Sequence, residues 1–298
     1  MQKSESTKKD SLGRAVSLAA LSLIVIVVVS IFAFVMSRGL STFFHDGVHV
    51  KDFLFGSTWN PSVVNPQTKQ PYIGALPMIL GSFLVTFLAA IVATPFAIGT
   101  SLFMTEIAQK RGAKIMQPII ELLVGIPSVV YGWVGISVLV PFIKNNFGGM
   151  GYSLLSGILV LSLMVLPTIA TLCIDAIKTI PQDHIEASYG LGATRWQTIY
   201  KVIVPGAKSG ILTGVVLGIA RAFGEALAVQ MVIGNTVKIP DGILSSMSTL
   251  TSVITMDMAN TVGGTMWNNA LWSLALILLI ISFGFILLVR FIGKRCSK

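Results

Sequence analysis

The sequence predicts an all-α polytopic membrane protein with six transmembrane helices. Apolar residues make up 54% of the 298 residues, charged residues make up only 11%, and the mean hydropathy is +0.83. A soluble domain carries about 25% charged residues, whereas a helix needs about 20 mostly apolar residues to cross a bilayer. The apolar residues fall into six blocks of that length, at about residues 15–36, 76–104, 117–142, 152–177, 208–234 and 270–292.

The cations predict the side of the membrane on which each connection lies, because Lys and Arg beside a span are retained in the cytoplasm. Fifteen cations lie in the N-terminal tail, in the connections after the second and fourth blocks, and at the C-terminal end. The other connections hold five: Arg38, Lys51, Lys69, Lys144 and Lys238. We therefore expect a multi-pass protein of a cell membrane, with both tails, residues 1–14 and 293–298, in the cytoplasm; the resemblance described below implies a bacterium or an archaeon.

The first block, residues 15–36, is expected to stay as a transmembrane helix within the lipid bilayer. It is longer than the apolar part of a usual signal peptide, and no small-x-small cleavage site follows it. The net charge of +9 is scattered at the membrane boundaries without interleaved aromatic residues, which argues against nucleic-acid binding. Cys173 and Cys296 have no neighbouring ligand residues, so we expect neither a disulfide nor a metal site.

Two connections are expected on the outer side of the membrane. Residues 37–73 contain three prolines and several Asn, Thr and Gly, which predicts an ordered extracytoplasmic loop that could dock a partner. Residues 235–269 are rich in Ser, Thr, Met and Gly, and we expect a short helix at the membrane rim within them. Residues 235–269 offer no catalytic cluster, and His45 and His49 in the first connection have no third ligand for a metal, so we expect ordinary solvated histidines there.

The cytoplasmic connection 178–205 has the pattern of two short helices. The first is expected to begin near Pro181 and to run to Tyr189, because Gly190 and Gly192 follow. Thr194 and Gln197 have the spacing of a capping box at the start of the second helix, and Pro205 lies where that helix should stop. The pattern predicts a compact helical hairpin below the membrane.

The residues of this hairpin resemble the EAA loop of ABC importer permeases. Glu186-Ala187-Ser188 is followed after three residues by Gly192 and after nine more by Val202-Ile203-Val204-Pro205. The family pattern is Glu-Ala-Ala, then Gly, then Ile-x-Leu-Pro at the same spacing, so Ser188, Val202 and Val204 are mild departures. The resemblance implies the type I ABC importer permease fold, with residues 74–292 as the core domain and the hairpin as the coupling element that fits a groove on a separate ATPase. Ala187 and Gly192 would allow close approach, and Glu186 and Arg195 could make polar contacts. An ordinary amphipathic surface helix is the alternative.

Charged residues within the apolar blocks are the candidates for the transport pathway. Arg221 and Glu225 are four residues apart in the fifth block, so a continuous helix would place them on one face. A charge at the bilayer centre costs roughly 2.5–3.5 kcal/mol, so both side chains should face protein or water. The guanidinium of Arg221 suits an oxyanion, with Glu225 holding it between transport events, whereas a salt bridge that only fixes helix packing is the alternative. Glu121 in the third block could belong to the same polar interior.

The fifth block also carries small residues at every fourth position. Gly210, Gly214, Gly218, Ala222 and Ala226 form a seam that should let another helix pack closely.

A second resemblance indicates which solute is transported. Arg221-Ala222-Phe223-Gly224-Glu225, with Ile233-Gly234-Asn235, is similar to the phosphate importer permeases of the PstC type, and so is the segment from Gly125 to Gly132. Ala226-Leu227, where Thr-Met is common, is a small departure. The resemblance implies inorganic phosphate as cargo and a complex with a sibling PstA-type permease, an ATPase dimer and an extracytoplasmic phosphate-binding protein.

Other functions are less consistent with the sequence. It lacks a Gly-x-x-x-x-Gly-Lys-Ser/Thr loop, so ATP and Mg²⁺ would be used by the partner ATPase, and this chain is expected to bind no cofactor. Motifs of metalloproteases and serine hydrolases are also missing, so the chain is not expected to be an enzyme. A permease for sulfate or molybdate, or an ion-coupled secondary transporter that uses Arg221 and Glu225 as a relay, remains an alternative.

Overall fold

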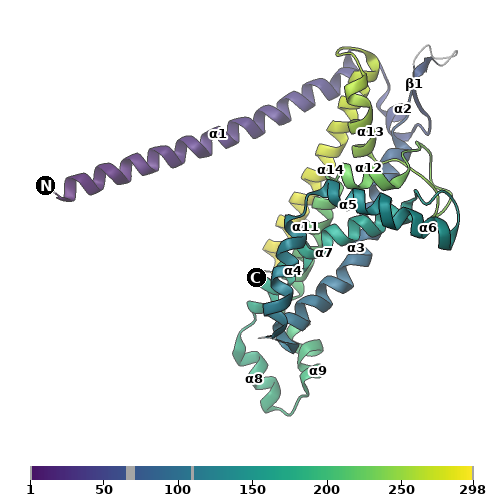
Figure 1. Ribbon diagram of the computed structural model, residues 1–298. Coiled ribbons are helices and arrows are strands. Elements are labelled where there is room, and N and C mark those ends of the chain that lie inside the picture. The colour runs from purple at the N-terminus through teal and green to yellow at the C-terminus, as the bar shows by residue number, and fades with distance from the viewer. Residues whose placement is uncertain (1, 65–70, 109–110, 297–298) are drawn as a thin grey trace.

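The computed structural model describes residues 2–64, 71–108 and 111–296, and these are almost entirely helical (Figure 1). Lys69, Lys110 and Lys298, three of the cations used to predict orientation, lie outside these residues. The elements are α1 (Gln2–Phe44), α2 (Val50–Phe55), β1 (Trp59–Val64), β2 (Pro71–Ile73), α3 (Leu76–Leu102), the π-helix η1 (Phe103–Ile107), α4 (Arg111–Gly125), α5 (Ser128–Val134), the π-helix η2 (Gly135–Leu139), α6 (Val140–Phe147), α7 (Leu154–Lys178), α8 (Gln182–Gly190), α9 (Arg195–Thr198), the π-helix η3 (Ile199–Ile203), α10 (Val204–Gly206), α11 (Lys208–Phe223), α12 (Leu227–Ile233), α13 (Leu250–Asp257), the 3₁₀-helix η4 (Met258–Asn260) and α14 (Met266–Cys296).

The described part of the chain contains five helices that are long and apolar enough to cross a membrane. They cover residues 13–44, 76–107, 128–147, 154–178 and 266–292. The helices Arg195–Gly206 and Lys208–Phe223 would form a sixth span, bent by 65° at Ala207. The predicted all-α class is therefore confirmed, with five to six candidate spans.

Three predicted boundaries are wrong. The third block, 117–142, is not one helix, because α4 ends at Gly125 and α5 begins after Pro127, whose ring removes a backbone donor. The fifth block, 208–234, is also divided, since α11 ends at Phe223 and α12 begins at Leu227. The first helix continues beyond residue 36 to Phe44, so the expected outer loop 37–73 begins with helix.

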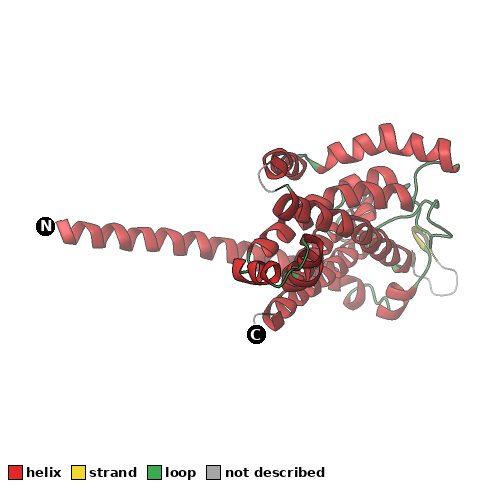
Figure 2. Cartoon of the chain, turned by 90° about the horizontal axis from the view of Figure 1, so that it is seen from below, coloured by secondary structure: helices red, strands yellow, loops and turns green. Residues whose placement is uncertain are grey.

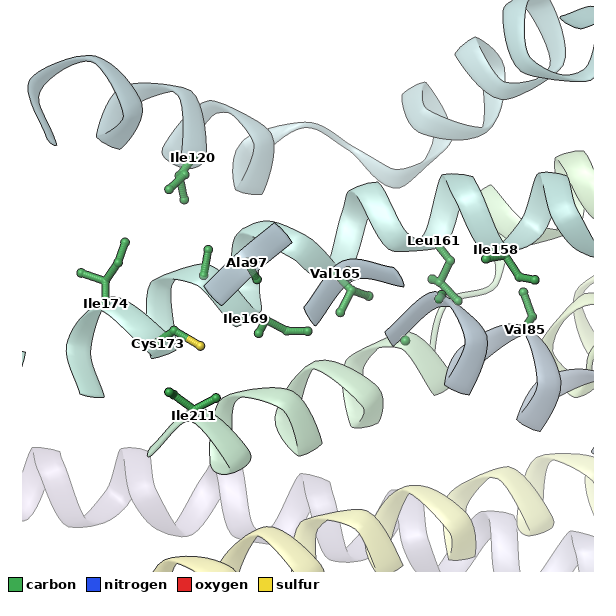
Figure 3. Close-up of a cluster of buried hydrophobic side chains, with 14 of the residues drawn as sticks. Val85, Ala97, Ile120, Ile158, Leu161, Val165, Ile169, Cys173, Ile174 and Ile211 are labelled. Atoms are coloured by element: carbon green, nitrogen blue, oxygen red, sulfur yellow. The ribbon is translucent and has the colours of Figure 1, made fainter. Parts of the chain in front are cut away.

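Helix α7 lies at the centre of the bundle. Its side chains Leu161, Val165, Ile169 and Cys173 are almost inaccessible and pack with Ala97 of α3 and other residues of one continuous core (Figure 3). Ser101 of α3 adds a polar tie, because its hydroxyl donates to the Ala170 carbonyl of α7 at 3.0 Å. The core therefore fixes α3 and α7 to each other along their length.

The predicted seam of small residues is confirmed over α11. A Cβ atom added at Gly210 would lie 2.3 Å from Ala176 Cβ, and one added at Gly218 would lie 2.6 Å from Ile169 Cγ1. Both neighbours belong to α7, so α11 and α7 approach as closely as glycine allows. Ala226 is not part of the seam, because the chain has left the helix before that residue.

The end of the bundle opposite α8 and α9 is capped by short elements. Strands β1 and β2 form an antiparallel pair, visible at the edge of the bundle in Figure 2, and Phe53 of α2 belongs to the same apolar cluster as Trp59 and Ile73 of these strands. The short helix expected within residues 235–269 is α13, which begins with a capping box at Thr249 and Ser252. Helix α1 leaves the bundle as a long arm, and its C-terminal part packs on α14 through Phe34 and Trp272 (Figure 1).

Candidate functional site

The predicted pair of Arg221 and Glu225 does not form. Among the described residues the ion pair found is Lys238–Asp241, and Arg221 instead donates from Nη1 to Thr168 Oγ1 of α7 at 2.5 Å. The i, i+4 rule that predicted the pair requires a continuous helix, and α11 ends between the two residues. Tight backbone bonds from Gly224 to Arg221 and from Glu225 to Ala222 close the helix at that point.

Glu225 stabilises the start of α12 instead. Its Oε1 accepts a bond from the Ala228 backbone N–H at 3.4 Å, at the helix end where free N–H groups favour a carboxylate. Its backbone carbonyl accepts a bond from Thr251 Oγ1 of α13 at 2.9 Å. The carboxylate and the guanidinium are therefore held by different parts of the fold.

Arg221 lies in a groove of about 520 Å³ between α4, α7 and α11. The groove is lined by the polar side chains Gln117, Glu121, Thr168, Thr171 and Arg221 and by the apolar side chains Ile120, Val124, Leu172 and Leu217. Glu121 was expected in the same polar interior as Arg221, and the structure places both in this one groove. Glu225 does not line it.

The groove presents hydrogen-bond donors around a single cation. Arg221 is exposed and has one bond to Thr168, so its remaining N–H groups are free to meet a ligand. Gln117 donates to Glu121 Oε1 at 2.8 Å, which orients the carboxylate without neutralising it. This arrangement can bind a small oxyanion through the planar guanidinium and neighbouring hydroxyls.

Thr168 and Gln117 were not predicted as site residues. Gln117 could have been found from its spacing of four residues from Glu121 on one helix. Thr168 gives no such signal, because its contact with Arg221 joins residues 53 positions apart. Tyr131, also missed, bridges the break between α4 and α5 by donating from Oη to the Leu123 carbonyl at 2.8 Å.

The hairpin that resembles the EAA loop lies below the bundle, at the end opposite β1 and α13 (Figure 1). The predicted first helix is α8, with Glu186, Ala187 and Ser188 in its second half. The predicted capping box is present, with the Gln197 N–H on Thr194 Oγ1 at 3.4 Å and the Thr194 N–H on Gln197 Oε1 at 2.9 Å. Helix continues through Pro205 to Gly206, close to the predicted stop.

The turn of the hairpin is built on Gly192. Its φ of +80° is the left-handed conformation that favours glycine. Ser188 and Thr198 share a hydroxyl bond of 3.0 Å that holds α8 against α9. Leu191, Trp196 and Tyr200 are 89%, 69% and 68% exposed, so the hairpin carries an apolar and aromatic surface outside the bundle.

Glu186 and Arg195 were both expected to face a partner. Glu186 is exposed, as that expectation requires. Arg195 is exposed as well, and within this chain its Nη2 donates to the Ile107 carbonyl of η1 at 3.2 Å.

The sequence is similar to a known protein family and to individual permeases. Residues 97–298 match the family described as binding-protein-dependent transport system inner membrane component. The chain is 50% identical to the probable ABC transporter permease protein YqgH of Bacillus subtilis (strain 168), over 95% of this chain and 90% of that protein. It is 32% identical to the phosphate transport system permease protein PstC of Pasteurella multocida (strain Pm70), over 83% of this chain and 80% of that protein.

Solved structures agree in fold. A chain of a bacterial ABC transporter involved in the import of the acidic polysaccharide alginate is similar with a TM-score of 0.65, over 97% of this chain and 99% of that chain. The identity is 15%, so this similarity describes the fold alone.

Proposed function

Because the chain belongs to the family of binding-protein-dependent transport system inner membrane components, it is the permease subunit of an ABC importer, and we propose that its cargo is inorganic phosphate. The chain is the membrane component and not the ATPase, and the family has no cofactor of its own. ATP hydrolysis by a separate subunit therefore supplies the work, and an extracytoplasmic binding protein delivers the cargo.

The groove with Arg221 is the observation that carries the phosphate proposal. A guanidinium with free N–H groups beside the Thr168 and Thr171 hydroxyls offers several donors to one tetrahedral oxyanion. The PstC proteins, at about 30% identity, support the same cargo.

Glu121 favours phosphate over sulfate or molybdate. Its carboxylate can only accept hydrogen bonds when ionised, and phosphate keeps a hydroxyl at neutral pH that can donate to it. Sulfate and molybdate have no such proton at neutral pH, so the same carboxylate would repel them. The groove would thus bind phosphate weakly, and it would distinguish phosphate from sulfate and molybdate by the proton that phosphate carries as well as by charge.

The exposed surfaces of the chain suit the other subunits of such an importer. We expect the ATPase dimer to bind the apolar tip of the hairpin at Leu191, Trp196 and Tyr200. A sibling permease would cover the exposed apolar side of α4 and α5, including Leu122 and Trp133, and complete the groove. Closure of the ATPase would then move the hairpin and expose the groove to each side of the membrane in turn.

The test is uptake by the assembled complex in vesicles. This chain, a sibling permease, the ATPase and the binding protein should accumulate phosphate, with sulfate and molybdate excluded, and accumulation should require ATP. Arg221→Gln should lower phosphate uptake by about tenfold to about a hundredfold, because a hydrogen bond to a charged group contributes about 1.5–3 kcal/mol. Arg38→Gln, which removes an exposed cation outside the groove, is the matched control and should retain uptake.

Three results would contradict parts of this proposal. Normal uptake by Arg221→Gln at normal abundance would remove Arg221 from the pathway. Equal accumulation of sulfate or molybdate would reject phosphate as the specific cargo. Uptake driven by an ion gradient without ATP would favour the secondary transporter instead.

A further inference from the structure

We propose that Arg195 is a positioning residue that ties the hairpin to the cytoplasmic end of the span α3–η1, so that movement of the hairpin is delivered directly to that span. The inference rests on the proposed role of the hairpin in coupling. It assigns Arg195 a partner within its own chain, where the sequence suggested a contact with the ATPase.

The contact joins two distant parts of the chain at a helix end. Arg195 Nη2 donates to the Ile107 carbonyl at 3.2 Å, across 88 residues of sequence. Ile107 is the last residue of η1, which continues α3 into one span of residues 76–107. The final carbonyls of a helix lack partners within the helix and carry the negative end of its dipole. A guanidinium is therefore well suited to bind there, and it also attracts the nearby Glu106 carboxylate.

The hairpin holds the backbone of Arg195 in place. Arg195 is the first residue of α9, directly after Thr194, whose capping box with Gln197 fixes the start of that helix. The Ser188–Thr198 bond of 3.0 Å then joins α9 to α8. A displacement of the hairpin tip must therefore move Arg195 with it.

The span held by Arg195 leads to the groove. Ser101 lies six residues before Ile107 on α3–η1, and its hydroxyl donates to the Ala170 carbonyl of α7 at 3.0 Å. Ala170 is two residues from Thr168, which binds Arg221 at 2.5 Å. Buried Ala93 and Ala97 pack in the same core as α7, so α3 and α7 move as one body. Arg195 thus connects the hairpin to the groove through α3–η1 and α7.

Apolar packing also joins the two parts, because Ile185, Ile199 and Ile203 belong to the same core as Met104 of η1. A cavity of about 380 Å³ lies between Thr105 and Glu106 on one side and Lys178, Gln182 and Ile185 on the other. In this region Arg195 adds a directional hydrogen bond to the apolar packing between the two parts.

The experiment uses the complete importer in lipid nanodiscs or vesicles, with Arg195→Ala, Arg195→Lys and Lys201→Ala. Lys201 is an exposed cation of the same hairpin region and is the matched control for loss of charge. Three quantities are measured: ATPase recovered with the permease, the rate of ATP hydrolysis stimulated by the binding protein, and phosphate taken up per ATP hydrolysed.

We expect Arg195→Ala to bind the ATPase normally but to lower uptake per ATP by at least about fivefold, the lower end of typical coupling between sites. Arg195→Lys should recover part of the coupling, because an ammonium can still donate to a carbonyl. Lys201→Ala should match the wild type. A variant that merely lost stability would lower abundance and leave uptake per ATP in the surviving complexes unchanged.

Two outcomes would overturn the inference. Loss of ATPase binding in Arg195→Ala would show that Arg195 faces the ATPase, and unchanged uptake per ATP would show that the contact transmits nothing. Failure of the wild-type complex to accumulate phosphate with ATP would instead reject the proposed function. The inference about Arg195 and the proposed function therefore fail in distinguishable ways.

Discussion

Gly210→Ala is the sharpest test of the packing between α11 and α7. The new Cβ would lie 2.3 Å from Ala176 Cβ, about 1.1 Å short of the 3.4 Å at which ordinary contact begins. The Cβ of an alanine cannot rotate away, so the two helices must separate or bend. Overpacking of this kind costs roughly 1–3 kcal/mol.

Gly284→Ala is the matched control, because Gly284 lies in helix α14 and its added Cβ would have no atom within 4 Å. Both substitutions gain the same helix propensity of about 1 kcal/mol, so their difference isolates the clash. Gly214→Ala should fall between them, since its nearest atom, Leu172 Cβ, is 3.0 Å away.

The assay is thermal unfolding of the purified protein in detergent, followed by circular dichroism. We expect Gly210→Ala to unfold a few degrees below Gly284→Ala, with Gly214→Ala between them. Equal unfolding temperatures for Gly210→Ala and Gly284→Ala, or a higher one for Gly210→Ala, would refute the close approach of α11 and α7.

Two further predictions concern the two ends of the molecule. Gly192→Asp should weaken ATPase association and ATP-coupled uptake, because any residue with a side chain is strained at the φ of +80° found at this position. Gly190→Asp is the control and should change neither quantity, because Gly190 lies at an open helical position. Unchanged association in Gly192→Asp would contradict the assignment of the hairpin. At the outer end, burial raises the pKa of Asp257 above its ordinary value, an effect opposed by the indoles of Trp59 and Trp267. A raised pKa in the folded state means that the folded protein retains the proton to higher pH than the unfolded chain, so stability is highest at acid pH and falls as pH rises through the range between the two pKa values. The unfolding temperature of the wild type should therefore fall relative to that of Asp257→Asn as the pH rises above about 4, the ordinary pKa of an aspartate, and a constant difference would contradict the shift.

The surroundings of Asp257 show how the outer cap is assembled. Trp59 of β1 and Trp267 of α14 have buried indole nitrogens that make no hydrogen bond of good geometry within the described structure. Both indoles lie near the Asp257 carboxylate and oppose the rise in its pKa that burial causes. Asp257 of α13 and Trp267 of α14 thus lie near Trp59 of β1, which is about 200 residues earlier in the sequence.

Local patterns predicted the parts of the fold that depend on neighbouring residues. The apolar blocks predicted the all-α membrane class, and the repeated glycines predicted the face of α11 that packs on α7. The spacing of Thr194 and Gln197 predicted a capping box that the structure contains. Each of these features is set within a few turns of helix, where periodicity and hydrogen bonding are local.

The tertiary structure alone decided how the charged residues are used. A continuous helix would have placed Arg221 and Glu225 on one face, but the long-range bond from Thr251 Oγ1 to the Glu225 carbonyl supports a break at that point. Arg221 consequently binds Thr168, and Arg195 binds Ile107, at separations of 53 and 88 residues. No local pattern encodes such partners, because a helix satisfies its backbone groups locally, whereas a charged side chain binds whichever group the tertiary packing brings near it.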